Sequence, residues 1–168
     1  MDILDKARSS QNVLEQLVGK IPGFAGYQDK DLRRDADRLQ REHLAARLEE
    51  NKKALNDVAL GATRVGALDA INDVETARKR LDKVVARIRY ADRGYAGFFD
   101  AIKVDDALLA RVYQFDLDLL GAVEEISLAA QAAAASDNVK AGVSALVAQI
   151  DALDGRLAER EQLLSGFK

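Results

Sequence analysis

Two short segments of the sequence share one unusual order of residues: glycine, an aromatic residue, alanine, glycine and a second aromatic residue. The first is residues 23–27 and the second is residues 94–98. The chain has four tyrosines, five phenylalanines and no tryptophan, and most of these aromatic residues lie in or beside the two segments: Phe24, Tyr27, Tyr95, Phe98 and Phe99. Aromatic side chains supply much of the binding energy at protein interfaces. The pattern therefore indicates either a recognition site or an apolar lid over one end of a helical protein.

Three arginines accompany the two segments. Arg34 and Arg38 follow the first segment, and Arg93 directly precedes the second. Arginine binds carboxylates and phosphates through a planar fork of donors, so these residues beside aromatic rings would suit a protein partner or a small anion. Arg38 also has Glu42 four residues further on, at helical spacing. A solvated lattice of surface charges is therefore the alternative interpretation of the arginines.

The sequence gives little support to catalysis or to a metal site. It contains one histidine, His43, and no cysteine, so the ligand sets of zinc sites and di-iron bundles are missing. No second histidine could serve a serine nucleophile as a base, and no phosphate-binding glycine loop is present. We interpret His43 as a packing residue, with a pH-sensing or ligand role as the alternative. We therefore expect no enzyme activity, no metal and no cofactor.

The elements that must position these residues are helices. Apolar residues recur at three- and four-residue spacing along most of the chain, which is rich in Ala and Leu and has a single proline. Pro22 and Gly23 end the first helical stretch, and Gly66 ends the second. We predict an N-terminal helix over 1–20 and four long helices over 29–65, 68–91, 105–134 and 138–165.

Short connections between the long helices predict an antiparallel four-helix bundle in one all-α domain over 1–168, with the N-terminal helix in addition. The helix over 29–65 runs away from the first glycine-aromatic segment, and the next helix runs back toward the second. We therefore expect both segments as loops at the same end, which we call the glycine-aromatic end. We expect their aromatic residues to meet there and to stay partly accessible beside the arginines. The second half of 29–65 has a coiled-coil-like seam that includes Asn51, which we expect to set register or association.

Charge and hydropathy limit the kinds of partner and the cellular compartment that the sequence favours. The formal net charge is −3 with both signs interleaved, so we expect no nucleic-acid partner, which would need a net basic stripe. The first residues lack the apolar run of a signal peptide, and no apolar stretch is long enough to span a bilayer. The N-terminal helix lacks the lysine-rich face of an interfacial anchor, although contact with a membrane surface stays open. These features and the lack of cysteine favour a cytoplasmic protein.

The sequence thus predicts a non-enzymatic interaction or scaffold protein. It would bind a protein partner, or a second copy of itself, through the glycine-aromatic end. The alternative is a regulatory bundle that binds a small anionic ligand at the same end.

Overall fold

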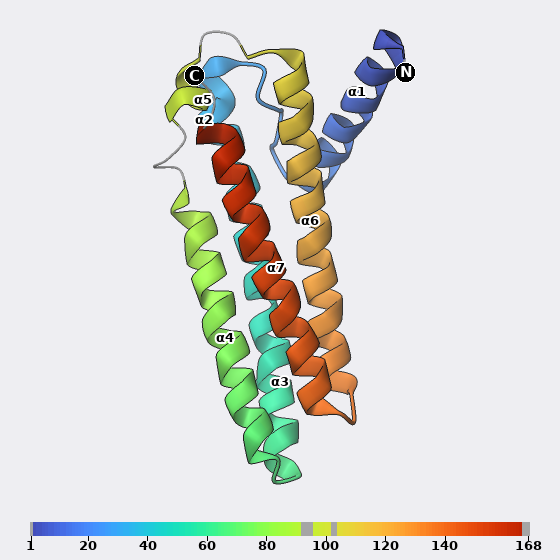
Figure 1. Cartoon of the computed structure of the whole chain (residues 1–168), viewed down its shortest axis with the longest axis vertical. Coiled ribbons are helices and arrows are strands. Elements are labelled where there is room, and N and C mark those ends of the chain that lie inside the picture. Colours follow the sequence, from blue (N-terminus) through green and yellow to red (C-terminus); the bar gives the residue numbers. More distant parts are fainter. Residues whose placement is uncertain (1, 92–95, 102–103, 166–168) are drawn as a thin grey trace.

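The computed structural model describes residues 2–91, 96–101 and 104–165, and these residues fold into helices joined by turns, with no strand among them. Figure 1 shows long helices packed side by side, with one helix leaving them near the N-terminus. The elements in chain order are α1 (Ile3–Lys20), the 3-10 turn η1 (Lys30–Leu32), α2 (Arg33–Glu49), α3 (Asn51–Arg64), α4 (Leu68–Arg89), α5 (Ala96–Asp100), α6 (Asp106–Ala135) and α7 (Val139–Ser165). The predicted all-α fold is confirmed.

The long helices form an elongated bundle. α2 and α3 follow one another along a single rod, and α4, α6 and α7 run beside it (Figure 1). The α2–α3 rod and α6 run in one direction along the bundle, whereas α4 and α7 run in the opposite direction. α6 packs against α7, α2 and α3, while α4 packs against α7, α2 and α3. Each helix turns an apolar stripe inward, as α4 does with Val74, Ala77 and Leu81, because only burial of these stripes removes them from water.

The helix predicted over 29–65 is divided in the structure. The side chain of Asp29 accepts a hydrogen bond from the backbone N–H of Asp31 at 3.0 Å, so the first turn is the tighter η1. Glu50 then separates α2 from α3, because its backbone N–H is shared between two carbonyls of α2 and the regular pattern is interrupted. α1, α4, α6 and α7 begin and end within two residues of their predicted bounds.

The connection predicted as a loop over 92–104 contains a short helix, α5, that the apolar spacing did not predict. Phe98 and Phe99 of α5 are both buried, and α5 packs against α7. One helical turn therefore places two adjacent aromatic side chains against the bundle, which an extended loop would direct to opposite sides.

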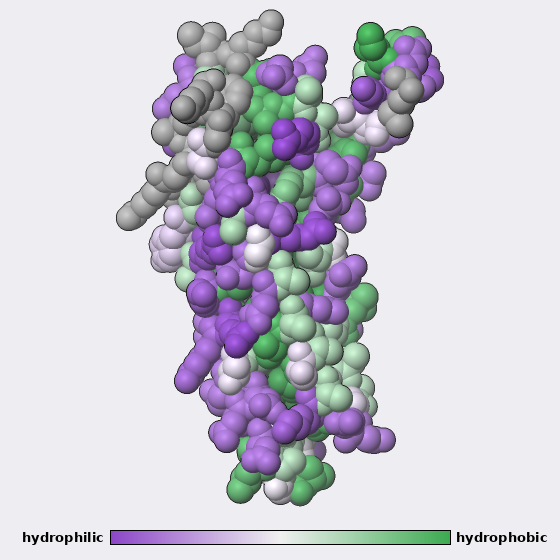
Figure 2. All heavy atoms as spheres, viewed as in Figure 1, coloured by the Kyte–Doolittle hydropathy of each residue, from purple (hydrophilic) through white to green (hydrophobic). Residues whose placement is uncertain are grey.

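Helix α1 belongs to the bundle only through its C-terminal half, where Val13 and Leu17 are buried and the helix packs against α6. Residues 3–12, which we call the α1 arm, are exposed or half-buried, and Ile3 and Leu4 keep 82% and 66% of their surface exposed. Figure 1 shows the arm diverging from α6 toward the N-terminus, and Figure 2 shows hydrophobic surface at its tip. The arm thus carries apolar surface that the described chain leaves uncovered.

Candidate functional site

The two glycine-aromatic segments meet at one end of the bundle. The ring of Tyr27 lies edge-on to Phe24 at 5.4 Å between centroids and edge-on to Phe98 at 5.7 Å, and it stacks on Tyr113 of α6 at 5.5 Å. Phe98 in turn contacts Phe99 at 5.6 Å. We call these five residues the aromatic cluster. All five are buried, with no more than 3% of their surface exposed.

Gly26 allows the first segment to lie close to α6. Its φ of +94° is in the left-handed region, which glycine adopts without strain. A Cβ atom at this position would lie 2.7 Å from the hydroxyl oxygen of Tyr113. The same hydroxyl accepts a hydrogen bond from the backbone N–H of Tyr27 at 2.8 Å. The glycine is therefore required by both the turn and the close approach.

Arg33, the first residue of α2, ties the two segments together. Its Nε donates to the backbone carbonyl of Tyr27 at 2.8 Å, and its Nη1 donates to the carbonyl of Ala101 at 2.6 Å. Its guanidinium also lies 5.8 Å from the centre of the Phe98 ring. Only 2% of Arg33 is exposed, so this arginine acts inside the end of the bundle and not on its surface.

The structure corrects the expectation that the predicted aromatic residues stay accessible. Phe24, Tyr27, Phe98 and Phe99 are close together but buried. Tyr27 stacks on Tyr113 of α6, and Phe98 and Phe99 lie on α5, which packs against α7. Tyr95 lies outside the described residues. In the described part of the chain, these rings therefore form a lid over the bundle and offer no aromatic contact surface.

The predicted arginines lie on the surface and already contact carboxylates. Arg34 covers the ring of Phe99 at 4.9 Å and forms an ion pair with Asp100 at 3.2 Å. Arg38 forms ion pairs on its own helix, with Asp35 at 3.3 Å and with Glu42 at 4.0 Å. The side chains of both arginines are more than half exposed. Arg93 lies outside the described residues.

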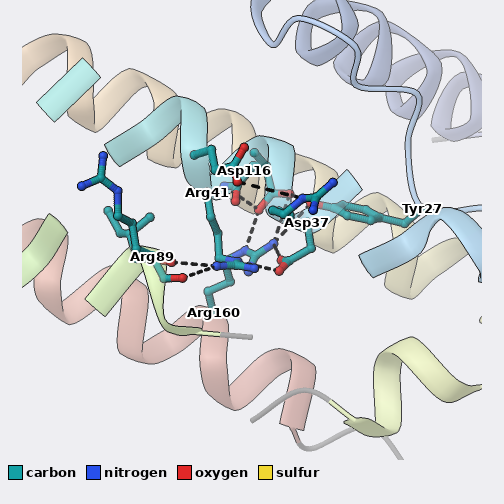
Figure 3. Close-up of polar contacts among 10 residues, drawn as sticks. Tyr27, Asp37, Arg41, Arg89, Asp116 and Arg160 are labelled. Atoms are coloured by element: carbon teal, nitrogen blue, oxygen red, sulfur yellow. Dashed lines mark hydrogen bonds and ion pairs between the residues drawn. The ribbon is translucent and has the colours of Figure 1, made fainter. Parts of the chain in front are cut away.

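A buried charge network lies directly beneath the aromatic cluster and consists of Tyr27, Asp37, Arg41, Asp116 and Arg160 (Figure 3). The hydroxyl of Tyr27 donates to Asp116 at 2.5 Å, and Nε of Arg160 donates to the same carboxylate at 2.7 Å. Nη2 of Arg160 donates to Asp37 at 2.9 Å. Arg41 donates to the other oxygen of Asp37 at 2.7 Å. The network thus joins α2, α6, α7 and the first glycine-aromatic segment.

Burial and the paired charges set the protonation of this network. Burial raises the pKa of Tyr27 well above 10.0, and the neighbouring Asp116 raises it further, so the phenol keeps its proton and donates. Burial also raises the pKa of Asp116, whereas Arg160 lowers it. Burial alone lowers the pKa of Arg160, but the carboxylates of Asp116 and Asp37 raise it well above its ordinary value. Because Tyr27, Arg160 and Gln40 all donate to Asp116, we treat this carboxylate as ionised at neutral pH.

Sequence reasoning missed this network, although the apolar stripes contain a signal for it. Asp116 lies at helical spacing from the buried Val112 and Leu119 of α6. Arg160 lies three residues after the buried Leu157 of α7. A charged residue on an apolar stripe is expensive to bury unless it is paired, so each position predicts an opposite charge on a facing helix. Which helices face each other was the missing information.

A groove of about 770 Å³ separates the α1 arm from the N-terminal part of α6, and we call it the α1–α6 groove. The buried or half-buried apolar residues that line it are Leu14, Leu109, Ala110 and Tyr113. Exposed charged residues, among them Asp106 and Arg111 of α6, also line it. Tyr113 belongs to both the groove and the aromatic cluster, so the first glycine-aromatic segment supports the wall of the groove.

Two polar residues on the α2–α3 rod have distinct environments. His43 is half-buried, and burial and then the cationic Arg47 lower its pKa from 6.5. Asn51 is buried in α3, and its amide nitrogen has no hydrogen-bond partner among the described residues. Asn51 therefore bears an unsatisfied donor, which lowers the stability of the fold.

Comparison with models of known protein families, with curated proteins and with solved structures found no match. Among the described residues, no helix has the length and apolar content needed to cross a membrane. In the same part of the chain, histidine, cysteine, aspartate and glutamate side chains form no group of three or more that could hold a metal ion. The function is therefore inferred from the geometry of the molecule itself.

Proposed function

We propose that this chain is a non-enzymatic interaction protein that takes up an amphipathic helix of a protein partner in the α1–α6 groove. The groove itself is the observation that supports this function most strongly. It lies at the glycine-aromatic end, combines apolar and charged lining residues, and has the α1 arm as one of its walls. Clefts between helices of a bundle are common binding sites, and an amphipathic helix is a common occupant of an apolar groove.

The spacing of apolar residues on α1 favours a helix as the occupant. Ile3, Ala7, Leu14 and Leu17 continue one stripe at helical spacing, with the small Ser10 between them. Leu17 is buried in the bundle, whereas Ile3 is exposed. A stripe of this kind is typical of helix–helix packing. Its outer half therefore suits the apolar face of another helix.

The aromatic cluster and the buried charge network have a supporting role in this proposal. They hold Tyr113 and the start of α2 in place, so one wall of the groove is rigid before a partner arrives. A preorganised site binds more tightly because less conformational entropy is lost on binding. The alternative, a small anionic ligand at Arg34 and Arg38, has less support, because both side chains already contact carboxylates.

Site-specific photocrosslinking tests the proposed function. A photoreactive amino acid replaces Ala107, an exposed residue that lines the groove on α6. The matched control carries it at Leu128, which is 65% exposed further along the same helix. We expect crosslinks to a protein from position 107 and none from position 128, in cells that produce the chain. Equal labelling at both positions, or none at 107, would show that the groove is not the binding surface.

A further inference from the structure

We infer that the helix bound in the α1–α6 groove is α1 of a second copy of this chain, so that two copies form a symmetric, interlocked dimer. This inference rests on the proposed function, because it names the occupant of the same groove. Three observations carry it: the shape of the groove, the exposed apolar tip of the arm and the order of charges on the two walls.

The shape of the groove allows two copies to interlock. α1 and α6 diverge toward their N-terminal ends, so the groove opens in the direction in which the arm points (Figure 1). When two such grooves face each other, each arm enters the groove of the other copy with its tip first and antiparallel to both walls. The helix order across the joint is then α6, second α1, first α1, second α6. Both grooves are filled and the assembly closes with two-fold symmetry.

The tip of the arm supplies the apolar surface for this joint. Ile3 and Leu4 are the most exposed large apolar residues of α1, at 82% and 66%. In the interlocked arrangement they reach the apolar part of the other groove, at Leu14, Leu109 and Tyr113. Burial of exposed apolar surface is the main driving force for association. The same joint therefore buries the exposed tip of one copy and fills the groove of the other copy.

The charges on the arm and on α6 follow a matching order. From the N-terminus, the arm carries Asp2 and Asp5 and then Lys6 and Arg8, whereas α6 begins with Asp106 and continues to Arg111. An arm that enters tip first places its acidic residues deepest, beside Arg111, and its basic residues at the mouth, beside Asp106. Asp106 and Arg111 are about 7.5 Å apart along the helix axis, and Asp2 and Lys6 about 6 Å, so the two steps match.

These charges are available for a second copy. Asp5, Lys6 and Arg8 of the arm and Asp106 and Arg111 of α6 are all exposed. None of them forms an ion pair within the part of one copy that the structure describes. In contrast, most arginines on α2 and α4 are paired to carboxylates of the same copy. Complementary charges that are free in the monomer give an interface its orientation.

The first test is the mass of the purified full chain in solution, measured by light scattering after size exclusion across a range of concentrations. We expect a dimer, and we expect the double variant Ile3→Glu, Leu4→Glu to be a monomer with an unchanged circular dichroism spectrum. Val65→Glu is the matched control, because Val65 is 74% exposed at the turn after α3 and should leave the dimer intact. A wild-type chain that remains monomeric at about 100 µM, or a control variant that dissociates equally, overturns the inference.

The second test examines the antiparallel order by exchanging charges. Arg111→Glu places like charges at the deep end of the joint and should raise the dissociation constant about tenfold. Asp2→Arg in the same chain exchanges the charge that this order places beside position 111 and should restore most of the affinity. If the double variant is as weak as or weaker than Arg111→Glu alone, the arms do not meet the groove in this order and the inference is wrong.

Crosslinking separates failure of this inference from failure of the proposed function. In the purified protein, the photoreactive residue at position 107 should give a covalent dimer. If the chain is a monomer and position 107 captures a different protein in cells, the groove binds a helix but not that of a second copy. If position 107 captures neither, both the dimer and the proposed function are wrong.

Discussion

The hydroxyl of Tyr27 donates a hydrogen bond to Asp116 across 2.5 Å and thereby joins the first glycine-aromatic segment to the middle of α6. Asp116 also accepts from Arg160 of α7 at 2.7 Å. One buried carboxylate therefore holds a loop and two long helices in a fixed relation. The segment behaves as part of the core, although its glycines and its position between helices are typical of a surface loop.

Replacing Arg160 should strongly destabilise the fold. Arg160→Leu leaves Asp116 buried without its cationic partner and removes one of two cations from Asp37, so we expect the free energy of unfolding to fall by about 3–5 kcal/mol. Urea denaturation followed by circular dichroism measures this loss. Arg156→Leu is the control on the same helix, because Arg156 forms an exposed ion pair with Asp118 and should contribute at most about 1 kcal/mol. Similar losses in the two variants would contradict the assigned network.

Gly26→Ala should destabilise the glycine-aromatic end. The new methyl group meets the hydroxyl of Tyr113 in a backbone conformation that alanine rarely adopts, and strain of this kind amounts to about 1–3 kcal/mol. Gly19→Ala is the matched control, because Gly19 lies in α1 with open space around it and should become slightly more stable as a helix. Thermal unfolding of the two variants should therefore shift in opposite directions. A shift of the same sign and size in both would remove the special role of Gly26.

The stability of the protein should depend on His43 in mildly acidic solution. Burial and Arg47 lower the pKa of His43 from 6.5, while Glu124 and Glu50 oppose this shift. Below pH 6.5 the unfolded chain therefore binds a proton that the folded chain resists. Stability is complete above pH 6.5 and falls as the pH drops toward the lowered pKa. His43→Gln, measured by urea denaturation between pH 7.5 and pH 5, should flatten this part of the profile. An unchanged slope would mean that the folded chain accepts the proton freely.

Asn51→Leu should raise the stability of the fold. The substitution removes a buried amide donor without a partner among the described residues and adds an apolar side chain to a buried face, for an expected gain of about 1 kcal/mol. Leucine is also the better helix former, so Asn72→Leu, at an exposed position of α4, is the control for that smaller effect. The gain at position 51 should exceed the gain at position 72. A clear loss at position 51 would indicate that Asn51 makes a specific buried contact.

Helix positions were predictable because they depend on local chemistry. Pro22, Gly66 and the apolar spacing along the chain act within a few residues, so the bounds of α1, α4, α6 and α7 follow closely. The division of the α2–α3 rod at Glu50 did not follow, because it rests on how one N–H is shared between two carbonyls and not on residue type. The meeting of Tyr27 and Phe98 could be expected from the direction of the helices alone.

Neither the burial of the aromatic residues nor the existence of the charge network could be predicted from the sequence. Arg33 and Arg34 are neighbours of the same type, yet one is 2% exposed and holds two segments while the other lies on the surface. Only the rotation of α2 about its axis distinguishes them, and that rotation is set by all its neighbours together. The open side of the α1 arm has a similar origin. Its apolar stripe is visible in the sequence, but the place where α6 stops covering it is not.

The buried charge network also imposes an order on the assembly of the chain during synthesis. Arg160 follows Asp37 by 123 residues and Asp116 by 44, so the ribosome releases both acids well before the cation that joins them. Because synthesis proceeds from the N-terminus, α2 and α6 emerge while Asp116 still lacks this counter-ion. The arrival of α7 then completes the glycine-aromatic end. A nascent chain halted before α7 therefore leaves Asp116 without the cation that pairs with it in the complete chain.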